Sequence, residues 1–307
     1  MFFGNNKFPE LNPTQVLVTL ALPGNQTPDT IDWSGLTVTH DKVPEYAIKG
    51  FPVIFRCVVS PAVGKAIPKI KLRQMIKTIL DATETEGYLI WKKLPDPAAG
   101  FLMQFDADST LYCEEQIDEF AVLIGKEKEV RAITERAMQG EIDFILALEQ
   151  RMVLLKGLEK HRAESIFDLL TYQPGVVSAL RFIKSKNWKF GIASGGFNLI
   201  VSKIMEKFGF DYGVANDIDW NGNRMTGKIP GPQVDGLRKK TILLEKACDY
   251  GIPLTNTYAI GDGSNDLQVI RAANFGFAYN PKPVLLKNSL GVIRHKNLSL
   301  SLRLMGL

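Results

Sequence analysis

The sequence predicts an α/β protein: a doubly wound parallel sheet with a small helical cap insertion, preceded by a small α+β domain. Segments typical of strands and helices alternate after residue 100, as they do in parallel sheets. The chain has 307 residues, and single hydrophobic cores stop growing at roughly 250–300 residues. Residues 94–100 hold two prolines and a glycine, a composition typical of a surface connection. We therefore expect one domain at 1–94 and a second at 100–307.

The first predicted domain contains three segments typical of strands, at 15–22, 53–59 and 88–91. Apolar residues at helical spacing predict a helix at 71–80, between the second and third strands. Because no cluster of catalytic residue types occurs here, the sequence places the chemistry in the second domain.

The second predicted domain begins with a short apolar strand at 101–105. A helical tract follows from about 114 to 170, with apolar residues at three- and four-residue spacings. Since this tract interrupts the sheet after its first strand, we expect it to form a cap. Further strands are predicted at 189–193, 257–260 and 275–278, and helices at 175–186, 197–208, 239–250 and 265–272.

Composition excludes several classes of protein. Lys and Arg number 37 and Asp and Glu 33, so the net charge of +4 is too small and dispersed for a nucleic-acid-binding surface. The three cysteines, Cys57, Cys113 and Cys248, are far apart and odd in number, which favours a reducing compartment over a disulfide framework. The start lacks the pattern of a signal peptide, and no apolar run approaches the ~20 residues of a membrane helix. We therefore expect a cytoplasmic protein with neither a membrane nor a nucleic-acid partner.

Three polar clusters follow predicted strands, at residues 106–110, 193–197 and 261–266. Each cluster alone is typical of a turn or a helix cap. However, ligands of open parallel sheets bind beyond the carboxyl ends of the strands, where all three clusters fall. Their conjunction predicts one shared active site.

The order of these clusters, with a lysine between the second and the third, resembles the haloacid dehalogenase superfamily of phosphatases. Within it, residues 115–119, 135–140 and 192–197 resemble the phosphoserine phosphatase family. The resemblance covers about 101–295 and implies a haloacid dehalogenase-like core with the cap above its active site.

The resemblance assigns roles to the motif residues. Asp106 is expected to be the nucleophile that forms an aspartyl-phosphate, and Asp108 the general acid and base, help that is typically worth ~10²–10⁴-fold in rate. Ser194 and the amide of Gly195 are expected to donate hydrogen bonds to the phosphoryl oxygens, which Asn265 also approaches.

The resemblance also implies a Mg²⁺ site, because a divalent cation can bridge a carboxylate and a phosphoryl group that would otherwise repel each other. The expected ligands are the carboxylates of Asp106 and Asp262 and the main-chain carbonyl of Asp108, with Asp266 in support. A positive charge near the phosphoryl group comes from the run 238–240, just before a helix expected near Thr241. The family pattern favours Lys240, and Lys239 stays open as the alternative.

The predicted cap supplies the residues that would read the substrate. Glu115 matches the family's glutamate for an amino group, and Arg151 matches the arginine for a carboxylate. Met138 and Phe144 match apolar positions that exclude water. Ala107 departs from the family pattern, where a bulkier residue often stands between the two aspartates.

The resemblance therefore implies a Mg²⁺-dependent phosphoserine phosphatase that converts L-phosphoserine into L-serine in the last step of serine biosynthesis. One alternative is a related phosphatase or phosphotransferase for another small phosphorylated amino acid or alcohol. Another is a catalytically silent regulatory protein whose N-terminal domain binds a ligand. That domain is expected to be regulatory or dimerising, and a homodimer follows by analogy with the family.

Overall fold

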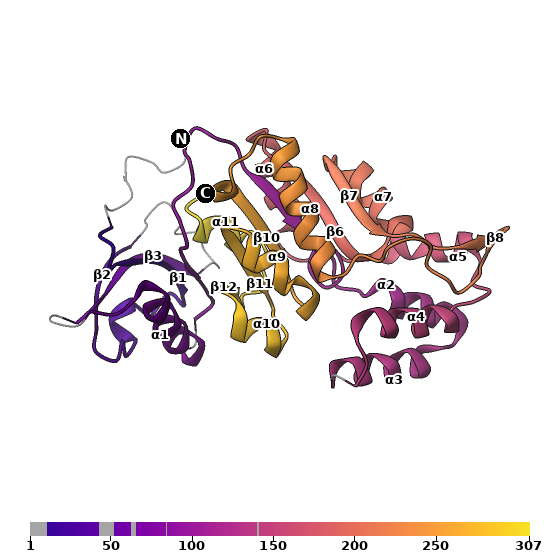
Figure 1. Ribbon diagram of the computed structural model, residues 1–307, viewed down its shortest axis with the longest axis horizontal. Helices are drawn as coiled ribbons and strands as arrows, with labels where there is room; N and C mark the ends of the chain where they lie inside the picture. The colour runs from indigo at the N-terminus through magenta and orange to yellow at the C-terminus, as the bar shows by residue number, and fades with distance from the viewer. Residues whose placement is uncertain (1–10, 43–51, 63–65, 84, 140) are drawn as a thin grey trace.

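The computed structural model describes residues 11–42, 52–62, 66–83, 85–139 and 141–307. A ten-stranded sheet extends across these residues in the order β2-β3-β1-β4-β12-β11-β10-β5-β6-β7 (Figure 1). The strands from β12 to β7 pair in parallel, whereas β1 to β4 pair antiparallel with one another and β4 joins β12 antiparallel. The strands are β1 (Val16–Leu22), β2 (Leu36–Lys42), β3 (Val53–Pro61), β4 (Gly87–Ile90), β5 (Leu102–Phe105), β6 (Lys189–Phe197), β7 (Tyr212–Asn216), β10 (Thr257–Gly261), β11 (Phe275–Tyr279) and β12 (Gly291–Ile293), with β8 (Trp220–Asn221) and β9 (Arg224–Met225) forming a separate hairpin.

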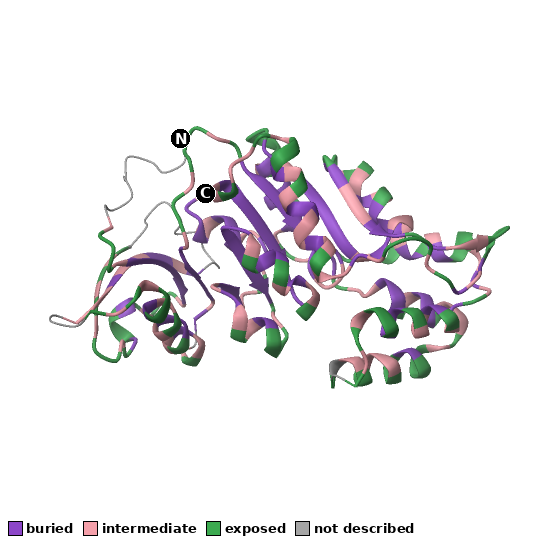
Figure 2. Ribbon diagram, viewed as in Figure 1, coloured by how far each residue is buried: buried purple, intermediate pink, exposed green. Residues whose placement is uncertain are grey.

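Helices cover both faces of the sheet, as the alternation of strands and helices predicts. One core holds α6 (Val176–Ser185), α7 (Asn198–Phe208) and α11 (Leu300–Leu304). The other holds α1 (Lys69–Ala82), α8 (Gly236–Asp249), α9 (Leu267–Ala272) and α10 (Pro283–Asn288). Strand β10 serves both cores, because Tyr258 and Ile260 pack into the first and Ala259 into the second. Figure 2 shows the buried strands between helices whose outer faces are exposed. The predicted fold class is confirmed.

The cap is inserted between β5 and α6. It contains α2 (Gln116–Ile124), α3 (Glu127–Met138), α4 (Phe144–Leu154), α5 (Lys160–Ser165) and the 3₁₀ turn η3 (Ile166–Leu169). Figure 1 shows α3 and α4 beyond the ends of the strands, clear of the sheet. The cap therefore stands where the loops after β5, β6 and β10 end. The remaining 3₁₀ turns are η1 (Pro28–Thr30), η4 (Leu254–Asn256) and η5 (Ser264–Asp266).

The N-terminal region extends the same sheet. Strand β4 pairs with β12 through Gly87 and Ile293 at one end and Leu89 and Gly291 at the other. The proline-containing connection at 94–100 therefore joins two parts of one sheet. That residues 1–94 and 100–307 are separate folding units stays a prediction.

Three strands of the large sheet were not predicted: β2, β7 and β12. Strand β12 has only three residues, and β7 contains a glycine and an asparagine, so neither carries a strong apolar signal. Strand β2 (Leu36–Lys42) does alternate between apolar and polar residues at its start, but threonine, histidine, aspartate and lysine make it polar overall. None of the described helices combines the length and the apolar character that crossing a bilayer requires.

Candidate active site

Three loops meet at one edge of the sheet because β10, β5 and β6 are neighbours in it. Asp106 follows β5, Ser194 and Gly195 lie at the end of β6, and Asp262 follows β10. Together with the cap, these loops enclose a cavity of about 370 Å³. Most of the predicted site residues line it: Asp106, Asp108, Glu115, Phe144, Arg151, Ser194, Gly195, Asp262 and Asn265.

A buried lysine stands between two carboxylates beside this cavity. Lys239 Nζ lies 2.7 Å from Asp106 Oδ1 and 2.7 Å from Asp266 Oδ1. Burial alone would lower the pKa of Lys239, but the two carboxylates outweigh it and raise that pKa. The site thus contains a fixed positive charge against Asp106. The preference for Lys240 is wrong, and the alternative, Lys239, occupies the position.

The error has a local cause. Helix α8 begins at Gly236, earlier than predicted, because the Asp235 side chain accepts a hydrogen bond in its first turn. Lys239 then lies one turn before the buried Ile242, on the face that packs against the sheet. The next residue, Lys240, is rotated away from that face and is half-buried.

The carboxylates form a group that can hold a cation. Oxygens of Asp106, Asp262 and Asp266 lie within 4.8 Å of one another. Both oxygens of Asp266 already accept hydrogen bonds, Oδ1 from Lys239 and Oδ2 from the Gly263 amide at 3.2 Å. Asp266 therefore suits a supporting role, which leaves Asp106 and Asp262 as the carboxylates able to ligate.

The charge of this group also fits a bound cation. Burial raises the pKa values of Asp262 and Asp266, and the negative charge of Asp106 raises them further. The main-chain carbonyl of Asp108 accepts no hydrogen bond from the described residues, so it is free to act as a ligand. Hard oxygen donors of this kind are those that divalent cations such as Mg²⁺ prefer.

Asp108 lines the same cavity as Asp106 and is held through one oxygen. Its Oδ1 accepts hydrogen bonds from the Tyr112 hydroxyl and from Gln116 Nε2, the latter at 3.0 Å. Burial and the nearby charge of Glu115 raise the pKa of Asp108 well above its usual range. A carboxyl group with a raised pKa can remain protonated and donate that proton, as a general acid must.

The end of β6, at residues 194–197, lines the same cavity as Asp106. Ser194 Oγ accepts a hydrogen bond from the Gly196 amide at 2.9 Å, which leaves its own hydrogen to donate. A Cβ atom on Gly195 would lie 2.9 Å from the Phe144 ring and 3.6 Å from Asn265 Nδ2. The glycine therefore lets the cap approach this loop closely through Phe144.

Two charged cap residues face the same cavity. Glu115 Oε1 accepts a hydrogen bond from Ser109 Oγ at 2.8 Å, and burial raises the pKa of Glu115. Arg151 donates from Nη1 to Thr134 Oγ1 at 3.4 Å, and burial lowers the pKa of its guanidinium. Met138 ends α3, and its side chain lies outside the described part of the structure.

Four further residues were missed by the sequence analysis. Tyr112 and Gln116 are four residues apart, but this spacing alone does not indicate that both contact Asp108. Lys282 Nζ lies 3.1 Å from Asp262 Oδ2, and Asn216 Nδ2 donates to the Gly195 carbonyl at 2.8 Å. Lys282 follows β11, a predicted strand, so its place after a strand end was the available signal. Asn216 ends β7, which was not predicted, so the sequence offered no such signal for it.

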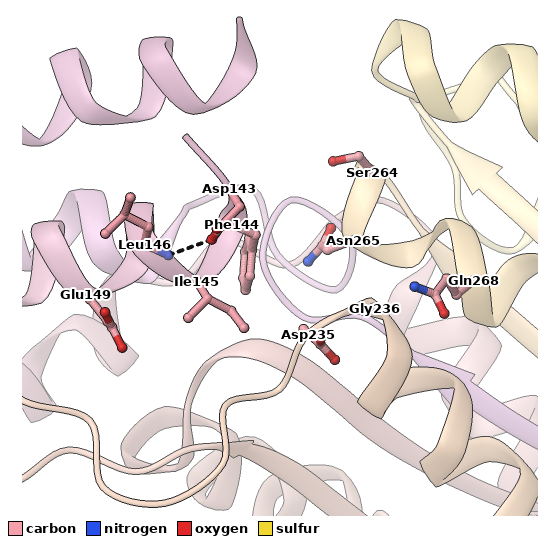
Figure 3. A pocket seen from close by; sticks show the side chains of 10 residues that line it. All are labelled: Asp143, Phe144, Ile145, Leu146, Glu149, Asp235, Gly236, Ser264, Asn265 and Gln268. Atoms are coloured by element: carbon pink, nitrogen blue, oxygen red, sulfur yellow. Dashed lines mark hydrogen bonds between the residues drawn. The ribbon is translucent and has the colours of Figure 1, made fainter. Parts of the chain in front are cut away.

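A second hollow, of about 590 Å³, adjoins the cavity between α4 and the start of α8. The two share Phe144, Ser264 and Asn265 in their walls. Figure 3 shows the Phe144 ring between α4 and Asn265, with Asp235 and Gly236 on the opposite wall. The cap and the core therefore meet at Phe144, between the two spaces.

Comparison with known proteins agrees with this geometry. The family of haloacid dehalogenase-like hydrolases matches residues 104–271. A phosphoserine phosphatase from Archaeoglobus fulgidus is 40% identical over 197 residues, which cover 64% of this chain and 57% of that protein. One from Saccharomyces cerevisiae is 31% identical over 296 residues, covering 95% of this chain and 96% of that protein.

Solved structures are also similar. One, described as a phospho-aspartyl intermediate analogue of phosphoserine phosphatase, is 35% identical and covers 67% of this chain and 98% of that chain, with a TM-score of 0.64. Among the sequence relatives, the chain spans less than two thirds of the archaeal protein, at 57%, and nearly all of the yeast protein, at 96%.

Proposed function

Because the chain belongs to the haloacid dehalogenase-like hydrolase family, we propose that it is a phosphoserine phosphatase that hydrolyses L-phosphoserine to L-serine and phosphate with the help of Mg²⁺. The match over residues 104–271 confirms the superfamily resemblance found in the motifs. We place the reaction at the last step of serine biosynthesis. A cytoplasmic location and a homodimer stay predictions.

The observation that supports phosphoserine as the substrate is the pair of opposite charges in one cavity. Phosphoserine has an ammonium and a carboxylate group besides its phosphate. Glu115 and Arg151 line the cavity that also contains Asp106 and Ser194. A carboxylate suits the ammonium, and a planar guanidinium suits the carboxylate. A phosphorylated alcohol without these groups would offer neither side chain a group of opposite charge.

In the proposed reaction, an Asp106 carboxylate oxygen attacks phosphorus, and the bond between phosphorus and the serine oxygen breaks. Asp108 donates its proton to that leaving oxygen and so becomes a carboxylate. It then takes a proton from the water that attacks the aspartyl-phosphate, which releases phosphate and restores Asp106. The raised pKa of Asp108 suits the first of these proton transfers.

The surrounding residues stabilise charge. Lys239 stands against Asp106, and the hydroxyl of Ser194 and the amide of Gly195 are the donors for the phosphoryl oxygens. Asp106, Asp262 and the Asp108 carbonyl would hold the cation. When bound, Mg²⁺ offsets the repulsion between the nucleophile and the phosphoryl group.

Phosphate release from L-phosphoserine, measured with Mg²⁺ and after chelation of divalent ions, tests the proposal. We expect metal-dependent turnover in the wild type and none above background in Asp106→Asn. Asp211→Asn is the matched control, because Asp211 lies at the surface opposite Lys189 and outside the cavity. It should keep full activity.

A panel of other phosphomonoesters separates the alternatives. Turnover of other small esters but not of phosphoserine would keep the chemistry of Asp106 and refute the roles given to Glu115 and Arg151. A folded protein that hydrolyses no ester yet binds an amino acid would favour the regulatory alternative.

A further inference from the structure

We propose that Tyr112 and Gln116 are positioning residues that hold one oxygen of the Asp108 carboxyl group and leave the other, Oδ2, for proton transfer. This inference rests on the proposed function, because it assumes that Asp108 is the acid and base of that reaction. Both side chains are fully buried. Both donate to the same oxygen, Oδ1, and Gln116 Nε2 also lies 2.6 Å from the Tyr112 hydroxyl oxygen.

The contacts make the two oxygens of Asp108 unequal. With two donors directed at Oδ1, a proton on the carboxyl group belongs on Oδ2. No described group donates to Oδ2, and the space beside it is kept open by Gly196. A Cβ atom on Gly196 would lie 3.1 Å from that oxygen. Oδ2 is therefore the oxygen that can reach a leaving group, and the two donors fix where it lies.

Gln116 also connects the acid to the phosphoryl-binding loop. Its Oε1 accepts a hydrogen bond from the Phe197 amide at 3.1 Å, three residues after Ser194. A Cβ atom on Gly196 would come within 2.4 Å of Gln116 Nε2, so only a glycine admits this contact. One buried amide thus sets the distance between Asp108 and the loop that binds the phosphoryl oxygens.

Gln116 also lies at the start of the cap. Gln116 is the first residue of α2, and Glu115, proposed to read the amino group, directly precedes it. The first turn of the cap therefore carries substrate recognition and the orientation of the acid on neighbouring residues. A buried tyrosine or glutamine most often serves packing alone; here both polar ends converge on a single catalytic oxygen.

The dependence on the leaving group tests the inference. A serine alkoxide needs a proton as it leaves, whereas p-nitrophenolate leaves without one. We therefore expect Tyr112→Phe and Gln116→Met to lower kcat/KM for phosphoserine by about 10–100-fold, part of the ~10²–10⁴-fold that general acid catalysis supplies. For p-nitrophenyl phosphate, kcat/KM should change by less than about threefold. Because both act on one oxygen, the double variant should lose less than the product of the single losses.

Tyr258→Phe is the matched control. It removes an equally buried hydroxyl, bonded to Ser301 Oγ at 2.9 Å, from the end of β10 remote from Asp262. It should leave kcat/KM unchanged for both esters. Thermal unfolding of each variant identifies the ones that fold, and Tyr112→Phe keeps its ring, so it decides the matter if Gln116→Met does not fold.

Equal losses for both esters in folded variants, or no loss for either, would overturn the inference. If the wild type hydrolyses another alkyl phosphate and not phosphoserine, the substrate proposal fails, and the ratio measured with that alkyl ester decides the inference in the same way. A wild type inactive on every ester would refute both.

Discussion

The N-terminal region and the cap are both additions to the parallel sheet, and they are attached to it in opposite ways. The N-terminal region is joined by strand pairing, since β4 lies against β12 and continues the sheet. The cap adds no strand to that sheet. Its main chain bonds instead to the β8–β9 hairpin, where the Gly157 amide donates to the Met225 carbonyl at 2.8 Å. At the cavity it contacts the core through side chains such as Phe144 against Gly195.

Polar contacts reinforce the difference. Lys77 Nζ, on α1, donates to the Leu286 carbonyl at 2.6 Å and lies 2.7 Å from Asp81 Oδ2. Lys92, just after β4, donates to the Arg271 carbonyl at 2.9 Å, at the end of α9. We call β4, β12 and these contacts the seam. A region that continues the sheet supports the fold, whereas a region whose side chains line the cavity can shape catalysis.

Among the variants that compare these regions, the one in the core between them should lose the most activity, and the other losses are judged against it. Lys239→Met removes the charge that stands 2.7 Å from Asp106, the proposed nucleophile, so kcat should fall by about 10²–10³-fold. Lys240→Met, one residue along the same helix, should stay within about twofold of the wild type. Phosphate release under saturating phosphoserine measures both, and a loss in Lys240→Met alone would contradict the geometry.

Substitutions in the cap are expected to change the recognition of the substrate and not the stability of the fold. Arg151→Met removes the proposed charged partner of the substrate carboxylate, a contact that would be worth roughly 1.5–3 kcal/mol. We therefore expect kcat/KM for phosphoserine to fall by about 10–100-fold, with kcat/KM for p-nitrophenyl phosphate unchanged. Arg136→Met is the control, because Arg136 also lies in the cap but pairs with Glu141 at the surface. If Arg151→Met weakened both esters equally, the cap would not read the amino-acid group.

The two additions also differ in how far the sequence predicts them. The cap and the three strand ends follow from apolar periodicity and from motifs, because loops after neighbouring parallel strands must meet. The seam cannot be predicted from the sequence, since β12 has only three residues and forms a strand only between β4 and β11. The antiparallel pairing that continues the sheet is a tertiary property without a local signal.

Within the site, the sequence predicts the residues that belong to motifs and misses the residues that hold those motif residues in place. Lys239 and Lys240 are adjacent, so only the start of α8 separates them, and Asp235 followed by Gly236 was the signal for that start. Tyr112 lies in the connection before α2, and Gln116 is the first residue of that helix; neither place in the sequence points to Asp108. Only the fold brings both to Oδ1 of Asp108.

The seam is expected to affect the fold and not the chemistry. Gly87 lies on β4, where a Cβ atom would come within 2.9 Å of the Val292 carbonyl oxygen. Gly87→Val should therefore lower the free energy of unfolding by about 1–3 kcal/mol, the usual cost of overpacking. Gly24→Val is the control, because nothing lies within 4 Å of the added atom. Denaturant unfolding measures stability, and a changed KM in folded Gly87→Val would break the separation between the two regions.

The smallest effect is expected at the edge of the seam, where it tests whether polar contacts add to strand pairing. Arg294 lies 3.6 Å from Asp81, donates to Thr85 Oγ1 at 2.7 Å and stands over the Tyr88 ring. Because its side chain is 27% exposed, solvent screens it, and Arg294→Met should lower the free energy of unfolding by only about 1 kcal/mol. Lys126→Met breaks an exposed pair in the cap, so its melting temperature should match the wild type. If Arg294→Met were equally silent, the contacts of Arg294 would add nothing to strand pairing.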